Sequence, residues 1–224
     1  MKSAGEGSGV KEGTGEIEST VGFDPASLDF DQQYKLLGGA VVPRPIALVT
    51  TLGEAGANAA PFSYFNAIGQ LPPMIIFSIG PKPGTIKDTL RNLRALPELV
   101  VHIVDDANIR KMNLCAVEYA SDVNEMERAG FRTAPSLRVK PPRIIDCPAQ
   151  LECRVMQILE LGQVPYYLVV AEVVYFHFHR DVVNERLHVD FEKLNPVGRI
   201  AGNGRYVRIT DNFSLNVPPV SEAP

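Results

Sequence analysis

The chain has 224 residues, 45% hydrophobic and 21% charged, with a net charge of −4. That length suffices for one sizeable core, and the small acidic excess disfavours non-specific binding to nucleic acid, which draws on positive charge. Three widely spaced cysteines without a CxxC pair predict neither a disulfide framework nor a zinc ribbon, and fit a reducing compartment. No apolar run reaches the roughly 18 residues that span a bilayer, and the N-terminus lacks the layout of a signal peptide. We therefore expect a soluble, cytoplasmic protein without a membrane partner.

The first residues of the chain are rich in Gly, Ser, Glu and Thr and contain almost no large apolar side chains. Such a segment does not offset the entropy lost on ordering. We predict a disordered tail over 1–22, one domain over 23–212 and a C-terminal tail over 213–224. Within the domain, a short helix is expected from Ser27, with the pair Gly38-Gly39 as its stop.

Alternation and apolar runs then predict an antiparallel strand pair over 46–52 and 58–62, followed by a third strand over 74–79. Prolines and a glycine break the pattern after residue 79, and apolar residues then recur at helical spacing. This predicts a helix with Thr85 as its N-cap, followed by a strand over 99–104.

Helical spacing returns over 107–119 and, more briefly, over 122–129. Two long strands over 151–161 and 166–179 then form a hairpin, and 205–209 is expected to close the sheet. About seven strands with helices inserted in only two places predict a mainly β fold rather than repeated βαβ units. Barrel closure or pairing with a second subunit would protect the sheet edges.

Several segments of the chain match a known pattern. In order, the chain carries PRPIALVTT, NAAPFSYFNAIG, PPMIIFS, KDTLRNL and NPVGRIAGNGRY. With these segments it resembles the flavin reductase-like, FMN-binding split-barrel family over roughly residues 24–210. The resemblance implies a Greek-key FMN-binding split β-barrel, usually a homodimer, with FMN near the subunit interface and its phosphate near the KDT segment. It also implies NADH or NADPH as a transient electron donor, and some family members serve as partners of monooxygenases.

The residues of the KDT segment suit a phosphate on their own terms. A phosphate needs cations and free N–H groups, and helix N-termini offer such groups. Lys87 would supply the charge and Thr89 a hydroxyl, although a capped, solvated helix start is the plainer interpretation. Arg44, stiffened between two prolines, is either a second phosphate contact or part of a salt bridge at the barrel rim.

The strand pair suits the flavin ring, because residues 58–66 combine polar edges with apolar walls. Ser63 and Asn66 could bind ring edges, whereas Phe65 is a ring contact or simply core. Thr50 and Thr51 point to opposite strand faces, so only one of them is expected to reach a ligand. The full set of expected flavin contacts is Arg44, Thr50, Thr51, Asn58, Ala59, Ala60, Pro61, Ser63, Phe65, Asn66, Ser78, Lys87, Asp88, Thr89 and Arg199.

Histidines and cysteines offer one further hypothesis. His177 and His179 share a strand face and could chelate a metal together with His188, but no Asp or Cys at ligand spacing joins them. A solvated strand face explains both histidines, so no metal is expected. Cys153, in a predicted long strand, is expected to be buried as a small apolar residue.

These observations favour an FMN-binding oxidoreductase that takes a hydride from NADH or NADPH onto flavin N5 and passes the electrons to an acceptor. The cofactor carries this chemistry, so no catalytic side chain is required. No dinucleotide-binding loop lies between a predicted strand and helix, so the nicotinamide is expected to bind transiently. The alternative is a flavin-binding carrier or sensor without turnover.

Overall fold

The computed structural model describes residues 20–202 and 204–217, and these fall into two compact units. The larger unit comprises 43–199 and 206–217, and it contains all the strands of the described chain. The smaller unit comprises 20–42 together with 200–202, 204 and 205. The expected disordered tail lies almost wholly outside the described residues, and the expected domain limits stay a prediction.

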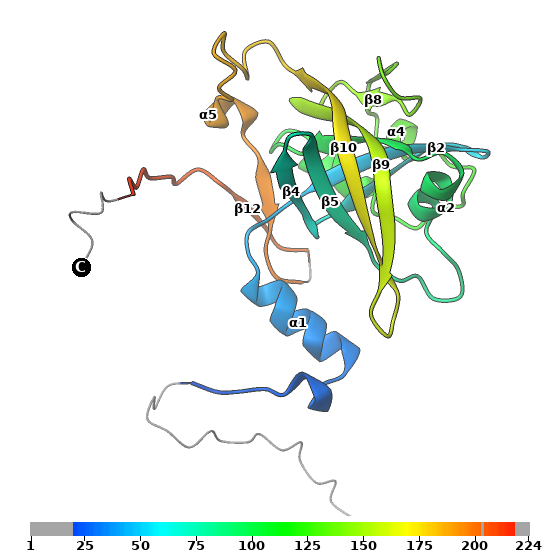
Figure 1. Ribbon diagram of the computed structural model, residues 1–224, viewed down its shortest axis with the longest axis vertical. Helices are drawn as coiled ribbons and strands as arrows, with labels where there is room; N and C mark the ends of the chain where they lie inside the picture. Colours follow the sequence, from blue (N-terminus) through cyan, green and yellow to red (C-terminus); the bar gives the residue numbers. More distant parts are fainter. Residues whose placement is uncertain (1–19, 203, 218–224) are drawn as a thin grey trace, which may run out of the picture. The chain divides into compact units, whose positions relative to one another are not determined.

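The larger unit is mainly β, as predicted. Its main antiparallel sheet has seven strands in the order β3-β2-β6-β9-β10-β5-β4, and β1, β11 and β12 form a second sheet. The strands are β1 (Arg44–Pro45), β2 (Ala47–Gly53), β3 (Gly56–Phe62), β4 (Phe65–Gln70), β5 (Pro73–Ile79), β6 (Glu98–Ile103), β7 (Thr133–Ala134), β8 (Arg143–Ile144), β9 (Ala149–Leu161), β10 (Tyr166–Phe178), β11 (Val197–Arg199) and β12 (Tyr206–Arg208). Figure 1 shows β9 and β10 running side by side as the long hairpin that the sequence predicts.

The strand pair β2–β3 forms as predicted, with Thr51 opposite Asn58 and a tight turn between Gly53 and Gly56. Gly56 has φ of 119°, which an L side chain rarely adopts, so the turn requires glycine there. Strand β2 also pairs with β6, so it lies inside the sheet and both of its faces are buried.

Two expectations about the sheet are wrong. Strand β4 was not predicted, because most of its side chains are exposed and its pairing with β5 is irregular between Ala67 and Gly69, so no clean alternation marks it. The last strand, β12, does not close the main sheet. It pairs with β11, placing Val197 opposite Arg208, and β11 in turn pairs with β1.

The helices are short. They are α1 (Phe30–Ala40), α2 (Asp88–Ala95), α3 (Ile109–Leu114), α4 (Glu125–Arg128) and α5 (Phe191–Leu194), with a 3-10 turn over Pro25–Ser27. In the described part of the chain, none is long and apolar enough to cross a membrane. Helix α3 stops earlier than predicted, and α4 begins later, after the Asn124 cap.

The N-cap of helix α2 lies two residues later than predicted. Its N-cap is Lys87, and Thr85 instead faces Lys82 across a turn. That turn has Pro83 and Gly84 at its centre, and Gly84 has φ of 73°. Proline followed by a left-handed glycine is the sequence of a type II turn, which removes Thr85 from the helix.

In the smaller unit, α1 begins and ends differently from the prediction. Asp29 accepts a hydrogen bond from Gln32 N (2.8 Å) and Gln32 Oε1 accepts one from Asp29 N (3.0 Å), which makes Asp29 the N-cap of a capping box. The helix passes through Gly38 and Gly39, so the glycine pair does not stop it, and the Val41 N–H donates to Leu37 O at its end.

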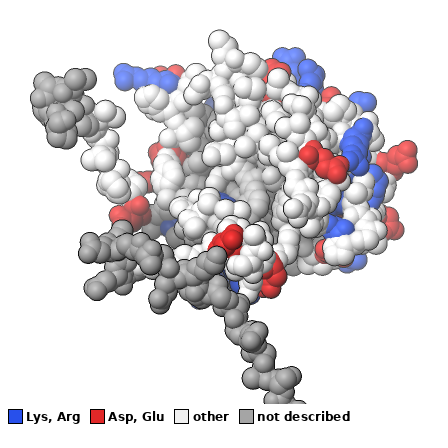
Figure 2. Space-filling view, turned by 60° about the horizontal axis from the view of Figure 1, so that its bottom comes forward, with Lys and Arg blue, Asp and Glu red and all other residues white. Residues whose placement is uncertain are grey.

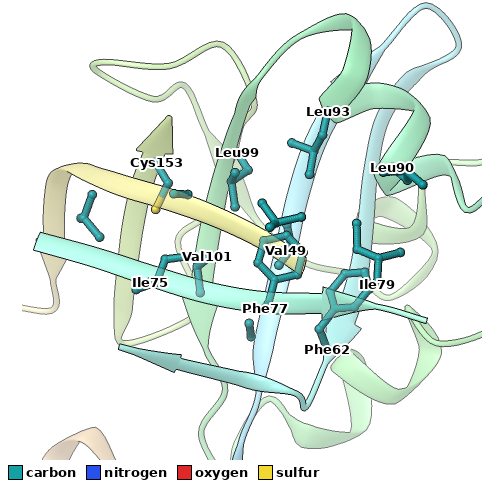
Figure 3. Packing of buried hydrophobic residues seen from close by; sticks show 14 residues of the cluster. Val49, Phe62, Ile75, Phe77, Ile79, Leu90, Leu93, Leu99, Val101 and Cys153 are labelled. Carbon is teal, nitrogen blue, oxygen red and sulfur yellow. The ribbon is translucent and has the colours of Figure 1, made fainter. Parts of the chain in front are cut away.

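The main core lies between the sheet and α2. Apolar side chains from β2, β3, β5, β6 and β9 point toward one another there, with Leu90 and Leu93 of α2 closing the cluster (Figure 3). Cys153 belongs to this core, as predicted. A second cluster, which includes Leu48 and Met126, covers the other face of β2. Because α2 packs on β2 and β3, its first turn is held beside the β3 strand.

The surface carries both signs of charge. In the face shown in Figure 2, lysines and arginines alternate with acidic residues along one rim, so neither sign dominates that face. This distribution agrees with the small net charge of the chain.

Candidate functional site

A cavity of about 240 Å³ lies where β3, the start of α2 and the segment after α3 meet. Asn58, Ala60 and Phe62 of β3 line it, because every second side chain of a strand faces the same side, and Pro61 between them lines it as well. The lining residues are Asn58, Ala60, Pro61, Phe62, Lys82, Lys87, Asp88, Thr89, Cys115, Ala116, Val117, Glu118, Tyr119 and Glu125. Six of the expected flavin contacts are among them, from two segments about thirty residues apart in sequence.

Asn58 connects the two segments. Its Oδ1 accepts a hydrogen bond from Thr89 Oγ1 (3.1 Å), and its Nδ2 donates to Glu125 Oε1 (2.7 Å). Thr51 Oγ1 approaches the same Oδ1 at 3.5 Å, and Asn92 Nδ2 donates to Thr51 Oγ1 at 3.1 Å. The Asn58 amide is therefore held at both ends by the protein, which fixes this wall of the cavity.

Glu125 is a cavity residue that the sequence does not reveal. Besides binding Asn58, its Oε2 accepts the Ala59 N–H at 3.0 Å, so one carboxylate binds a strand side chain and a strand amide. Burial raises the pKa of the Glu125 carboxyl, and the hydrogen bond from Ala59 only partly opposes that shift. In sequence, Glu125 follows the Asn124 cap and reads as an ordinary acidic residue of a first helical turn.

Two lysines give the cavity its positive charge. Lys82 Nζ lies 3.9 Å from Glu118 Oε2, whereas Lys87 forms no ion pair with any described residue. Burial lowers the pKa of the Lys87 ammonium, the Glu118 carboxylate opposes this, and the Lys82 charge adds to it. Asp88 forms an ion pair with Arg91 of the same helix. A half-buried ammonium beside a second one, at the start of a helix, fits a phosphate dianion.

Residues 39–197 match the family model described as the flavin reductase like domain. The chain belongs to the flavin reductase-like family. The predicted resemblance is thereby confirmed.

Solved structures agree with this assignment. Nitrilotriacetate monooxygenase component B from Bacillus cereus is 31% identical, with a TM-score of 0.85 over 89% of this chain and 100% of that one. The 2-nitrobenzoate 2-nitroreductase of Pseudomonas fluorescens is 35% identical, with a TM-score of 0.81 over 91% and 98%. A split-barrel structure from Shewanella frigidimarina, 16% identical with a TM-score of 0.75 over 86% and 96%, shows the same fold. The predicted split barrel is confirmed.

Within this flavin reductase-like chain, the two strand threonines face opposite ways, as expected, but both are fully buried. Thr50 Oγ1 donates to Pro142 O (2.7 Å) on the outer side of β2, whereas Thr51 lies beside Asn58 and Asn92. Neither threonine lines the cavity. Ala59 is buried as well, and its N–H is already bonded to Glu125.

Other expected contacts lie in β4, in β5 and in the connection before β4, outside the cavity lining. Phe65 packs against the main core, and Asn66 Oδ1 accepts the neighbouring Ala67 N–H at 2.8 Å. Ser63 lies in the connection between β3 and β4, and Ser78 pairs with Leu168 of β10.

Arg44 and Arg199 lie next to each other, and neither lines the cavity. They are paired residues of β1 and β11. The Arg44 guanidinium is buried 5.6 Å from the Tyr64 ring centre, and that of Arg199 lies 4.7 Å from the Tyr206 ring centre. Both can stack on aromatic rings there.

The expected solvated face for the two strand histidines is wrong. The His177 side chain is 14% exposed, and its Nε2 lies 2.6 Å from Glu152 Oε1. His179 Nε2 lies 2.9 Å from Ile145 O. The His177 ring therefore binds a residue of the neighbouring strand β9, and the His179 ring attaches the loop after β8 to the end of β10. In the part of the chain that the structure describes, no three His, Cys, Asp or Glu side chains gather as metal ligands.

Proposed function

We propose that this protein is an FMN-binding oxidoreductase of the NAD(P)H-dependent flavin reductase type. The observation that carries the proposal is the cavity in which Lys82 and Lys87 meet the first turn of α2 beside β3. Bound FMN would supply the redox chemistry, because it accepts a hydride at N5 from NADH or NADPH and passes the electrons on. The protein then has to bind and orient, and no nucleophile is needed. The one thiol at the cavity, Cys115, agrees with this, since burial raises its pKa to about 12.

In this proposal the phosphate lies between the two lysines. They supply positive charge, and the first-turn amides of α2 supply hydrogen bonds, since such N–H groups have no acceptor within the helix. A dianion beside Lys87 would offset the cost of its partial burial. Thr89 orients Asn58 rather than the phosphate, because its hydroxyl proton is already donated to Asn58 Oδ1.

The rest of the lining suits the flavin ring. Ala60, Pro61 and Val117 are small or apolar, which suits the flat faces of an isoalloxazine. Glu125 and Asn58 hold β3 in place behind them, so the wall is set before a ligand arrives. Prearranged walls of this kind reduce the cost of binding.

An anaerobic titration tests the proposal. The purified protein, loaded with FMN and freed of excess, should show the two-band absorption of oxidised flavin and bleach on addition of NADH or NADPH. A protein that does not bind FMN would refute the proposal. Binding without bleaching by either nicotinamide would instead identify a flavin carrier or sensor.

We propose that the electron acceptor is the flavin of a monooxygenase partner. We also propose that this protein is a homodimer and that it acts in the cytoplasm. Similarity to nitrilotriacetate monooxygenase component B, at 31% identity, supports this choice. Met156 of β9 and Phe176 of β10 are exposed apolar side chains on the hairpin, where a second copy could pack. Light scattering during size exclusion tests the dimer. Reduction of 2-nitrobenzoate without added flavin, the activity named for the Pseudomonas relative, would contradict the proposed acceptor.

A further inference from the structure

The segment between α3 and α4 forms one side of the cavity described above. Each residue from Cys115 to Tyr119 lines that cavity. Within the described part of the chain, every backbone hydrogen bond of 116–123, which we call the 116–123 loop, joins residues no more than three apart in sequence. A segment held only by local hydrogen bonds opens at low cost. The 116–123 loop can therefore move without breaking the sheet or a long helix.

Two polar side-chain contacts join this loop to the region around α2. Glu118 Oε2 lies 3.9 Å from Lys82 Nζ, in the turn before the helix. Ser121 Oγ accepts a long hydrogen bond of 3.4 Å from Arg91 Nη1, in the helix itself. The first contact uses one of the two lysines to which we assign the flavin phosphate. Glu118 is therefore an anion of the protein itself that meets a proposed phosphate ligand.

The charge of Glu118 reaches the second lysine as well. Burial lowers the pKa of the Lys87 ammonium, and the Glu118 carboxylate opposes that shift. Glu118, Lys82 and Lys87 all line the cavity, so a phosphate placed between the two lysines would lie beside the carboxylate. Two anions at one ammonium repel each other. A phosphate that binds Lys82 would therefore displace Glu118 from it.

The phosphate is the stronger of the two competitors. It carries close to two negative charges and can meet both lysines, whereas Glu118 lies within ion-pair distance of Lys82 alone. The Glu118 side chain is 73% exposed, and an exposed ion pair of this length is weak and adds little to stability. The pair can thus be exchanged, but it lowers the apparent affinity in proportion to the fraction of molecules in which it is closed.

We propose that Glu118 competes with the flavin phosphate for Lys82, and that it ties the 116–123 loop to Lys82 whenever no phosphate is bound. This inference rests on the flavin-binding role proposed above. Glu118 acts through Lys82 and so sets the position of a binding group rather than taking part in the chemistry. A weaker hold on the phosphate suits a flavin that is passed on rather than kept.

The test is a double-mutant cycle on equilibrium binding of FMN. Glu118→Gln should tighten FMN binding about threefold and leave riboflavin, which has no phosphate, unchanged. In a Lys82→Ala background the same substitution should change FMN affinity by less than about 1.5-fold, because the competition is gone. Lys87 remains in that background, so binding stays measurable. Asp122→Asn, which removes an exposed charge of the same loop outside the cavity lining, is the control and should change nothing.

Three outcomes would overturn the inference. Unchanged or weaker FMN binding in Glu118→Gln would mean that Glu118 does not compete with the phosphate. An equal gain with and without Lys82 would mean that Glu118 repels the phosphate at a distance instead of occupying the lysine. An equal gain for riboflavin would place its effect at the ring. Failure of the wild-type protein to bind FMN would refute the proposed function itself, so the two failures are distinguishable.

Discussion

Two buried glutamates, Glu125 and Glu152, have different hydrogen-bond partners, and the pKa values of their carboxyls are shifted in opposite directions. Glu125 accepts hydrogen bonds from Asn58 Nδ2 and Ala59 N, and burial raises its pKa. Glu152 is fully buried, which by itself would raise its pKa. Hydrogen bonds from the Leu137 N–H, the His177 ring and the Arg138 N–H outweigh burial there, so its pKa lies below the ordinary value.

The difference shows that the number of hydrogen-bond donors around a buried carboxylate, rather than its burial alone, decides whether its pKa is raised or lowered. Glu152 attaches the 137–138 loop to the β9–β10 hairpin and is closed to solvent. Glu125 borders a cavity and holds only one face of it in place. We therefore expect removal of Glu152 to cost more stability than removal of Glu125, and only removal of Glu125 to change ligand binding as well.

The largest effect is expected from Glu152→Ala. It leaves two amides and the His177 ring without their acceptor in a dry environment, at a cost of about 4 kcal/mol in the free energy of unfolding. Glu125→Ala should cost about 1 to 2 kcal/mol, since water from the cavity can replace the lost acceptor. Denaturant unfolding of both variants checks this. Equal losses of unfolding free energy would contradict the expected difference between the two glutamates.

His102 is a third buried titratable group, and acid unfolding tests its contribution to stability. His102 Nδ1 donates to Leu48 O (2.8 Å) and its Nε2 accepts the Ile144 N–H (2.8 Å), while burial lowers its pKa from 6.5 to about 4. Below pH 6.5 the unfolded chain takes up a proton that the folded chain excludes. Stability should fall by about 3 kcal/mol between pH 6.5 and 4. His102→Gln should flatten that window, and an unchanged slope would contradict the assignment.

The two glutamates should then give pH slopes of opposite sign. The folded pKa of Glu152 lies below its ordinary value of 4.5, so its contribution to stability is lost as the pH falls through and below that value. The folded pKa of Glu125 lies above 4.5, so its contribution decreases as the pH rises past that value. Unfolding free energies of Glu152→Gln and Glu125→Gln, measured against wild type from pH 3 to 7, check the signs. Slopes of the same sign would be inconsistent with the two environments.

The smallest effect concerns flavin affinity. Glu125→Gln removes one negative charge from a cavity that we propose holds a phosphate, and should tighten FMN binding about threefold. Glu127→Gln, on the exposed side of the same helix, is the matched control and should leave the affinity unchanged. Weaker binding in Glu125→Gln would show that its hold on Asn58 matters more than its charge.

The sequence predicted the regular parts of the fold well. Strands such as β2, β9 and β10 alternate or are continuously apolar, so local pattern is enough to find them. Strand β4 was not predicted because it is an exposed edge strand with an irregular pairing. Strand β12 was assigned to the wrong sheet because its partner β11 is too short to show an alternating pattern in the sequence. Helix α2 was found, but its start depended on the turn at Gly84.

For the candidate site, the sequence predicted that residues near Asn58 and Thr89 converge, and their hydrogen bond brings them together. It missed Glu125, which reaches the cavity through contacts with a distant segment, and Lys82, which lies in the turn before α2. Glu125 lies 67 residues from Asn58, and nothing local distinguishes it from a helix-capping acid. Arg44 and Arg199 were grouped with the site by their motifs, whereas their pairing in β1 and β11 sets them apart from the cavity.

The central claim is that Lys87 holds a flavin phosphate, and comparison of FMN with riboflavin tests it most directly because riboflavin lacks only that phosphate. Wild-type protein should prefer FMN, and Lys87→Ala should reduce that preference about tenfold or more while the melting temperature of the apoprotein hardly changes. The exposed Lys140→Ala is the control for lost charge. A Lys87→Ala protein with the wild-type preference for FMN, or one whose melting temperature falls along with its affinity, would contradict the account.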